Sequence, residues 1–254
     1  MNNGFGHAMY DSQKKKVVYY PGCFANYWDP LVGRSVVSVL EKNGLDVIVP
    51  RHQCCGLSRI GCGDIKGARK DADRLIDILF PLVKKGYDIV TACPSCSLAI
   101  KKEYPFFVNN EKSKLVAEST YFLSRYLNEL YEKGEIKMDF KRIPLTSVAY
   151  HAPCHLKAQN LETDSIKLMA LIPGLQIINI NRGCCGMAGA AGVKHEYYES
   201  SMIIGSALFK KIKEINAQIV ATDCGACKLQ IEQAAAVEVI HPITILDKAW
   251  RNYN

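Results

Sequence analysis

The chain has 254 residues, of which 48% are hydrophobic and 22% are charged, and its formal net charge is +7. Such a chain is long enough to bury a core in one or two domains. It has no run of the roughly 18 apolar residues that a membrane-spanning helix needs, no apolar first stretch of signal-peptide kind, and no aromatic-interleaved basic motif for nucleic acid. We therefore expect a cytoplasmic protein with reduced cysteines, because disulfides are rare in the cytosol.

The first part of the chain predicts three short strands separated by two helices. Short β-branched and aromatic runs indicate strands at 16–20, 46–49 and 87–91. Amphipathic stretches indicate helices at 31–42, ending before Gly44, and at 66–85, closed by Gly86. A helical stretch at 118–133 and the residues 134–144 follow as a connection.

The second part repeats this order. Strands are expected at 147–150, 176–179 and 218–221, with helices at 165–172 and 197–215. Alternation of strands and helices predicts a parallel sheet covered by helices in each half. We expect an α/β protein with two pseudo-symmetric halves, at 16–105 and 145–250, joined by a helical connector at 106–144.

Ten of the eleven cysteines fall into two copies of one pattern. Each copy has a lone cysteine, an adjacent pair and a Cys-x-x-Cys motif, and the two sets are Cys23, Cys54, Cys55, Cys93 and Cys96, then Cys154, Cys184, Cys185, Cys224 and Cys227. Corresponding members lie 130 or 131 residues apart, so the chain is a tandem duplication. The cysteines follow predicted strands, and the carboxyl ends of parallel strands meet at one edge of a sheet. Each half is therefore expected to gather five thiols.

Five gathered thiols favour iron–sulfur clusters, because each iron of a cluster takes a terminal thiolate. A zinc site stays open as an alternative, although structural zinc sites usually draw four ligands from two close pairs. A disulfide framework fits vicinal Cys-Cys pairs badly, and a redox dithiol at Cys93 and Cys96 leaves three thiols unexplained. A c-type haem would need histidine where Ser97 and Lys228 stand. The ten cysteines are thus the candidate ligands.

Three further residues near these motifs need an interpretation. Cys62 has no counterpart, because Gly192 occupies the matching position, and we interpret it as a buried or bystander thiol. His151 and His155 flank Cys154. We expect them to pack around the site, with ligation or proton donation as the alternative.

The motifs resemble the tandem cysteine-rich CCG domain family, to which the B subunit of heterodisulfide reductase belongs. The resemblance covers about residues 16 to 250 and is carried by Tyr-Tyr-Pro-Gly-Cys at 19–23, His-Ala-Pro-Cys-His at 151–155 and the two Cys-Cys-Gly sequences. Further segments are similar to the C-terminal part of the C subunit of anaerobic glycerol-3-phosphate dehydrogenase. They include Lys-Glu-Tyr-Pro at 102–105, Cys-Cys-Gly-Met-Ala-Gly at 184–189 and His-Pro-Ile-Thr at 241–244.

The resemblance implies that each cysteine set binds one iron–sulfur cluster of [4Fe-4S] type, which in heterodisulfide reductase is non-cubane. The sequence leaves cubane and non-cubane clusters open. Dehydrogenase proteins of this kind carry an additional N-terminal ferredoxin-like domain, for which the fifteen residues before the first predicted strand are too few. We therefore expect electrons to arrive from a separate flavin-containing or ferredoxin-like subunit.

The expected function is electron transfer between a flavoprotein dehydrogenase and a quinone or other acceptor. The protein would be cytoplasmic, and peripheral contact with the cytoplasmic face of the membrane would bring it to a quinone. One alternative is a catalytic disulfide reductase subunit of heterodisulfide reductase type. Another is a protein whose metals only stabilise the fold and whose role is membrane anchoring or assembly. Nucleic acid is not an expected partner.

Overall fold

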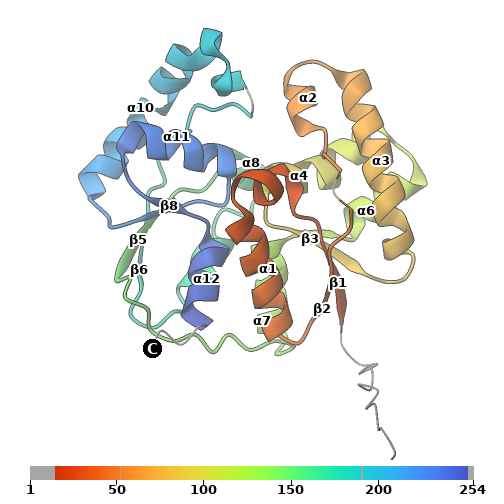
Figure 1. Cartoon of the computed structure of the whole chain (residues 1–254), viewed down its shortest axis with the longest axis horizontal. Coiled ribbons are helices and arrows are strands. Elements are labelled where there is room, and N and C mark those ends of the chain that lie inside the picture. Colours follow the sequence, from red (N-terminus) through yellow and green to blue (C-terminus); the bar gives the residue numbers. More distant parts are fainter. Residues whose placement is uncertain (1–14, 52, 190, 251–254) are drawn as a thin grey trace, which may run out of the picture.

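The computed structural model describes residues 15–51, 53–189 and 191–250, so most of the segment before the first strand lies outside the described residues (Figure 1). The described chain contains two four-stranded parallel sheets with the orders β2-β1-β3-β4 and β6-β5-β7-β8. The two orders are equivalent, because each strand of the second sheet takes the place of its counterpart in the first. The α/β fold with two repeated halves is confirmed.

The predicted strands are found within two residues of their expected bounds, but each sheet has a fourth strand that was not predicted. The strands are β1 Lys16–Tyr19, β2 Asp46–Ile48, β3 Asp88–Thr91, β4 Thr120–Phe122, β5 Ser147–Tyr150, β6 Gln176–Asn179, β7 Val220–Ala221 and β8 Val239–Ile240. The unpredicted β4 and β8 have three and two residues. Runs this short carry no readable period, and β4 also lies inside a stretch that has helical periodicity.

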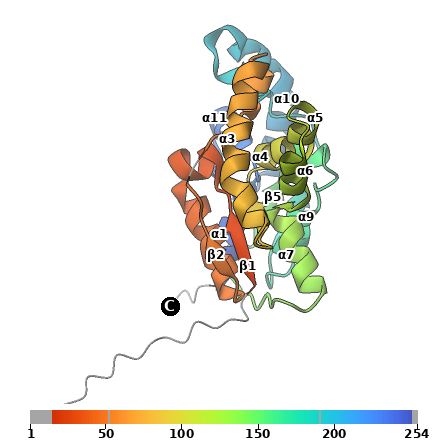
Figure 2. The ribbon, with the colours of Figure 1, turned by 90° about the vertical axis from the view of Figure 1, so that its right-hand side faces the viewer.

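Helices connect the strands. In the first half they are η1 Phe24–Trp28, α1 Pro30–Lys42, α2 Leu57–Gly61, α3 Ile65–Val83, α4 Pro94–Leu98, η2 Ala99–Glu103, α5 Tyr104–Phe107 and α6 Glu111–Glu118. The long α3 begins where the Asp64 carboxylate accepts a hydrogen bond from the N–H of Gly67 at 2.9 Å. Figure 2 shows α3 and α6 side by side on the outer face of the first sheet.

The remaining helices are α7 Leu123–Glu132, α8 Cys154–Lys157, α9 Asp164–Met169, η3 Ala191–Val193, η4 His195–Tyr197, α10 Tyr198–Ile215, α11 Gly225–Ala235 and α12 Pro242–Trp250. The expected connector at 106–144 thus contains helices and also β4, which is the outer strand of the first sheet, while 134–144 forms neither helix nor strand. No helix in the described ranges is both long and apolar enough to cross a membrane.

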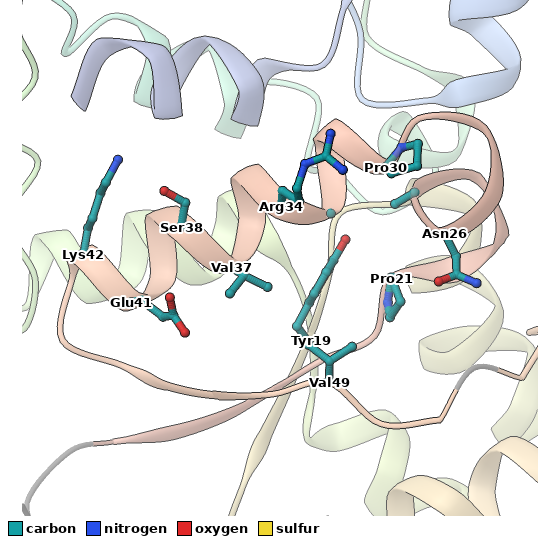
Figure 3. Close-up of a pocket in the computed structure, with 12 residues that line it drawn as sticks. Tyr19, Pro21, Asn26, Pro30, Arg34, Val37, Ser38, Glu41, Lys42 and Val49 are labelled. Atoms are coloured by element: carbon teal, nitrogen blue, oxygen red, sulfur yellow. The ribbon is translucent and has the colours of Figure 1, made fainter. Parts of the chain in front are cut away.

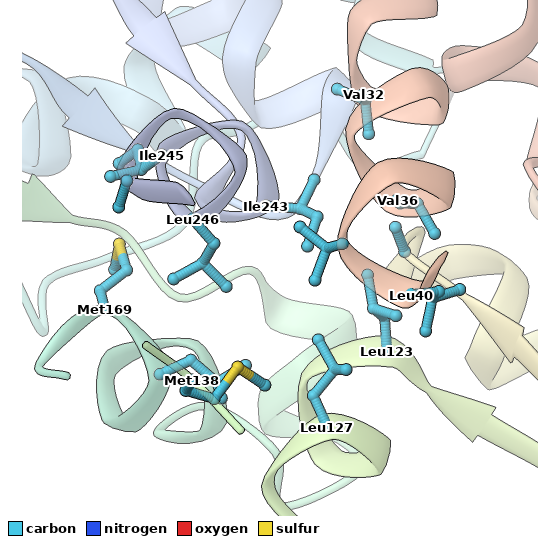
Figure 4. Packing of buried hydrophobic residues seen from close by; sticks show 14 of the residues in the cluster. Val32, Val36, Leu40, Leu123, Leu127, Met138, Met169, Ile243, Ile245 and Leu246 are labelled. Carbon is cyan, nitrogen blue, oxygen red and sulfur yellow. The ribbon is translucent and has the colours of Figure 1, made fainter. Parts of the chain in front are cut away.

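One hydrophobic core is shared by the two halves. The helices α1, α7, α9 and α12 lie between the two sheets, where side chains such as Val36, Leu40, Leu127 and Leu246 pack together (Figure 4). Smaller clusters lie under α3 and α6 in the first half and under α10 and α11 in the second. The shared core fixes the two sheets relative to each other, and with them the loops at their carboxyl edges.

Candidate metal centre

The first cysteine set gathers at the carboxyl edge of the first sheet. Cys23 follows β1, Cys54 and Cys55 follow β2, and Cys93 and Cys96 lie at the start of α4, directly after β3. Their thiols form one series of hydrogen-bonded neighbours in the order 23, 54, 55, 96 and 93. Cys23 is exposed at one end of the series, whereas Cys55 and Cys96 are buried.

The second cysteine set repeats this arrangement at the carboxyl edge of the second sheet. Its thiols are neighbours in the equivalent order 154, 184, 185, 227 and 224. The Sγ atoms of Cys227 and Cys185 are 3.2 Å apart. Cys154 is the exposed member. The structure therefore brings together all five predicted cysteines of each half, in the same relative positions.

A glycine after each cysteine pair shapes the turn that holds it. The N–H groups of Gly56 and Gly186 each donate a hydrogen bond at 3.4 Å to the sulfur of Cys54 and Cys184. Both glycines have positive φ, +78° and +88°. A Cβ at Gly186 would overlap the carbonyl oxygen of Ser201 in α10. Glycine is thus required by backbone conformation and by close packing at this turn.

Hydrogen bonds between the thiols shift their pKa values in opposite directions. A hydrogen bond from the Cys96 thiol lowers the pKa of Cys93 to about 7, and one from Cys154 lowers the pKa of Cys184. Hydrogen bonding to Cys54 raises the pKa of Cys23, with burial as the second cause. Neighbouring thiols thus share protons, and these protons must leave when metal binds.

The chemistry of the donors suits a group that takes several soft ligands. Among the described residues, no three His, Cys, Asp or Glu side chains are grouped to hold a single metal ion. The thiols form a series instead, and each half offers five sulfur donors along it. Thiolate sulfur is the ligand that iron–sulfur clusters take.

The two cysteine sets lie close to each other. The pKa of Cys224 is lowered, first by a hydrogen bond from Cys227, while burial and the electrostatic influence of Cys93 act in the opposite direction. His155, next to Cys154, places its Nδ1 atom 2.8 Å from the Oγ atom of Ser95, inside the first Cys-x-x-Cys motif. The carboxyl edges of the two sheets therefore face a common region.

The other residues near the motifs have distinct surroundings. His151 is buried, and its pKa is lowered to about 4, first by burial and second by Lys157, so the ring is neutral near pH 7. Cys62 is exposed at the end of α2, so the prediction that it is buried is wrong, and its interpretation as a bystander thiol stays a prediction.

A buried polar network beside the second cysteine set was missed by sequence reasoning. The carboxylate of Asp223, which precedes Cys224, accepts hydrogen bonds from Tyr150 at 2.6 Å and Ser165 at 2.7 Å. In the first half, Tyr19 corresponds to Tyr150, but Ala92 stands where Asp223 stands. The position of Asp223 directly before the Cys-x-x-Cys motif was the available signal.

Three relatives show what the chain is similar to. It is 34% identical over 238 residues to the C subunit of anaerobic glycerol-3-phosphate dehydrogenase from Escherichia coli K12, covering 93% of this chain and 59% of the relative. An uncharacterized iron–sulfur protein of Methanocaldococcus jannaschii is 27% identical over 226 residues, covering 88% and 42%. The D subunit of the dihydromethanophenazine:CoB–CoM heterodisulfide reductase from Methanosarcina barkeri is 29% identical over 227 residues, covering 85% and 53%.

The chain spans about half the length of these curated relatives. A family model for a cysteine-rich domain, CCG, matches the chain twice, at residues 17–101 and 148–232. The two matches include all ten cysteines of the two sets and lie on the two sheets described above. The chain belongs to the CCG cysteine-rich domain family, of which it contains two copies.

Proposed function

We propose that each cysteine set binds an iron–sulfur cluster of [4Fe-4S] type, cubane or non-cubane, and that the protein is a cytoplasmic electron-transfer subunit. The observation that carries this proposal is the pair of five-thiol series, equivalent in order and adjacent in space. A bound cluster would accept and release single electrons. A relative named as an iron–sulfur protein supports the cofactor.

The surrounding residues are suited to stabilising negative sulfur in a dry site. The N–H groups of Gly56 and Gly186 donate to cysteine sulfur, which favours the thiolate over the thiol. The buried Tyr104 donates from its hydroxyl to the carbonyl of Cys55 at 2.9 Å and so fixes the backbone of the cysteine pair. Burial of Cys55 and Cys96 limits access of water to the sulfurs.

Partners are proposed from the relatives. Two of them are named as subunits of a dehydrogenase and of a reductase, which supports a complex with a flavin-containing subunit or a ferredoxin-like subunit as the electron donor. The acceptor in this proposal is a quinone or a similar small molecule, reached by peripheral contact with the cytoplasmic face of the membrane.

A groove beside the first cysteine set supports a small-molecule acceptor. It measures about 730 Å³, runs along α1 and has a largely apolar lining that includes Pro21, Val37 and Val49, with Arg34 at one side (Figure 3). Tyr19 also lines it, and its hydroxyl is buried without a hydrogen-bond partner among the described residues. The pKa of Tyr19 is raised by burial and then by Cys93 and Cys96, so the residue that lines the groove is also near those thiols.

The cofactor proposal is tested by metal analysis of protein purified without exposure to air. We expect a brown protein with about eight irons per chain and matching acid-labile sulfide, four irons for each of two clusters. Cys93→Ser should lower iron to about half, whereas Cys62→Ser should leave it unchanged. Stoichiometric zinc without iron or sulfide would contradict the proposal and favour the alternative in which the metal only stabilises the fold.

A disulfide reductase is the second candidate function. One relative is named as a heterodisulfide reductase subunit, and the exposed Cys23 and Cys154 leave both sets accessible from outside. In this case the protein would be the catalytic subunit rather than a relay.

A further inference from the structure

The residue after the first cysteine of one half contacts the Cys-x-x-Cys motif of the other half. Phe24 follows Cys23, and its ring packs directly on the backbone of Gly225, which follows Cys224. A Cβ at position 225 would overlap the ring. The overlap would involve the inner ring atoms Cγ, Cδ1 and Cδ2, so its relief requires the whole Phe24 side chain to move. Glycine is therefore needed at 225 while Phe24 keeps this position.

The reverse contact is made by the corresponding residue of the second half. His155 follows Cys154 and forms the 2.8 Å hydrogen bond between its Nδ1 atom and Ser95 Oγ. One turn later, Gln159 accepts a hydrogen bond from Ser97 Oγ at 2.8 Å and donates one from Nε2 to the Pro94 carbonyl at 3.3 Å. The start of the second half therefore holds both sides of the first Cys-x-x-Cys motif.

Two other contacts close the region between the cysteine sets. Lys228, just after the second Cys-x-x-Cys motif, forms an ion pair with Asp29 at 3.0 Å, and both side chains are largely buried. The buried His241 places Nε2 3.1 Å from the carbonyl oxygen of Ala92, directly before Cys93. Each Cys-x-x-Cys motif is therefore bordered by residues of the opposite half.

We propose that Phe24 and His155 are positioning residues for the cysteines of the opposite half. Phe24 sets the backbone of the motif that carries Cys224 and Cys227, and His155 sets the motif that carries Cys93 and Cys96. Neither site is complete in its own half, and the two sites form one unit with a fixed separation. The consequence for electron exchange between two clusters rests on the proposed function, whereas the positioning itself does not.

The positioning is tested first in the reduced, metal-free protein, by measuring alkylation rates of individual cysteines by mass spectrometry. Gly225→Ala should raise the rates at Cys224 and Cys227 about tenfold, the ratio that 1.4 kcal/mol of easier local opening produces. Gly61→Ala is the matched control, because Gly61 is also helical and its Cβ would meet nothing within 4 Å. Phe24→Ala alone should also raise the rates at Cys224 and Cys227, because the motif then loses the ring that sets its backbone. The double variant Phe24→Ala/Gly225→Ala should react no faster than Phe24→Ala, because the methyl group then has room.

The second test concerns clusters in the loaded protein. His155→Ala and Ser95→Ala should each change the electron paramagnetic resonance signal and the potential of the first cluster, which is identified by its absence in Cys93→Ser protein. The double variant should show no further change, because both substitutions remove the same hydrogen bond.

The outcomes separate this inference from the proposed function. Equal alkylation in the Gly225→Ala and Gly61→Ala proteins, or unchanged rates at Cys224 and Cys227 in Phe24→Ala protein, would overturn the role of Phe24. A His155→Ala change confined to the second cluster would overturn the role of His155. A protein that binds no iron would refute the proposed function, while the alkylation experiment would still decide whether Phe24 of the first half positions the cysteines of the second.

Discussion

Equivalent residues of the duplication have acquired different partners. Tyr150 donates a hydrogen bond from its hydroxyl to the buried Asp223, whereas the hydroxyl of Tyr19 has no partner in the described part of the chain. The difference arises because Ala92 replaces the carboxylate. By contrast, the Cys-Cys-Gly turns are the same in both halves, including the 3.4 Å hydrogen bond from glycine N–H to sulfur. The Cys-Cys-Gly turns are thus repeated in both halves, whereas the hydrogen-bond partner of the equivalent tyrosine is not.

The turn at Gly186 gives a prediction for the metal-free protein. Gly186→Ala should lower the free energy of unfolding by about 2–4 kcal/mol, because alanine is strained at positive φ and its methyl group would overlap the Ser201 carbonyl. Denaturation by urea under reducing conditions measures this loss. Gly86→Ala is the control with a similar φ of +81° and open space around it, and it should lose only about 1 kcal/mol. Equal losses would show that the overlap with Ser201 is relieved at no cost.

The sequence alone predicts which cysteines lie together, because their spacing repeats and each set follows predicted strands. The contacts of Phe24 with Gly225 and of His155 with Ser95 could not. They join residues 60 or about 200 positions apart, and nothing in the local sequence indicates how one half is oriented on the other. The orientation is a property of the shared core.

At the scale of elements, α1 and α12 form the main connection between the halves. Asp247 of α12 is buried and accepts hydrogen bonds from Ser38 at 2.6 Å and Lys42 at 3.0 Å, both on α1. These polar contacts lie at the edge of an otherwise apolar interface. Because a buried carboxylate needs its donors, the network fixes the register of the two helices.

This network gives a second stability prediction. Asp247→Ala should lower the free energy of unfolding by about 2 kcal/mol, because hydrogen bonds to a charged group are lost. Glu41→Ala, an exposed charge on the same α1, should change it by less than about 0.5 kcal/mol. A double-mutant cycle in urea denaturation of Asp247→Ala and Lys42→Ala measures their coupling. Strictly additive losses would mean that the ion pair contributes nothing to the interface.

The longer strands could be predicted from the sequence, whereas two of the shorter ones could not. A strand of four residues with β-branched side chains, β6, was found at its expected bounds. The two-residue β8 exists only because β7 offers it an edge to pair with, through Val220 and Val239. Such a strand is determined by its neighbour rather than by its own residues.

At the scale of the whole molecule, a shared core joins the two halves, and the two cysteine sets lie near each other. Both proposed functions are compatible with this arrangement: a relay between docked partners, or a site where a substrate would meet the bound clusters. The difference lies in whether the chain turns over a substrate by itself.

The relay interpretation predicts the behaviour of the isolated, iron-loaded protein. A low-potential donor should reduce it, yet it should show negligible disulfide reductase turnover, because it would depend on docked partners for electron entry and exit. Electron transfer from a flavoprotein dehydrogenase to a quinone should be catalysed when both are added. The measurement is thiol release from a disulfide with an artificial donor, with Cys224→Ser protein as the control. Brisk turnover that Cys224→Ser abolishes would favour the catalytic alternative.

The unequal contacts across the halves bear on how such a chain can evolve. The two contacts between the halves differ in kind. The ring of Phe24 packs against Gly225, whereas the imidazole of His155 forms a hydrogen bond with the hydroxyl of Ser95. Two identical copies of either half would bring together the wrong partners at both contacts. A symmetric dimer of either half alone would therefore lack both contacts. A substitution at any of these four positions is therefore tolerated only with regard to its partner in the other half.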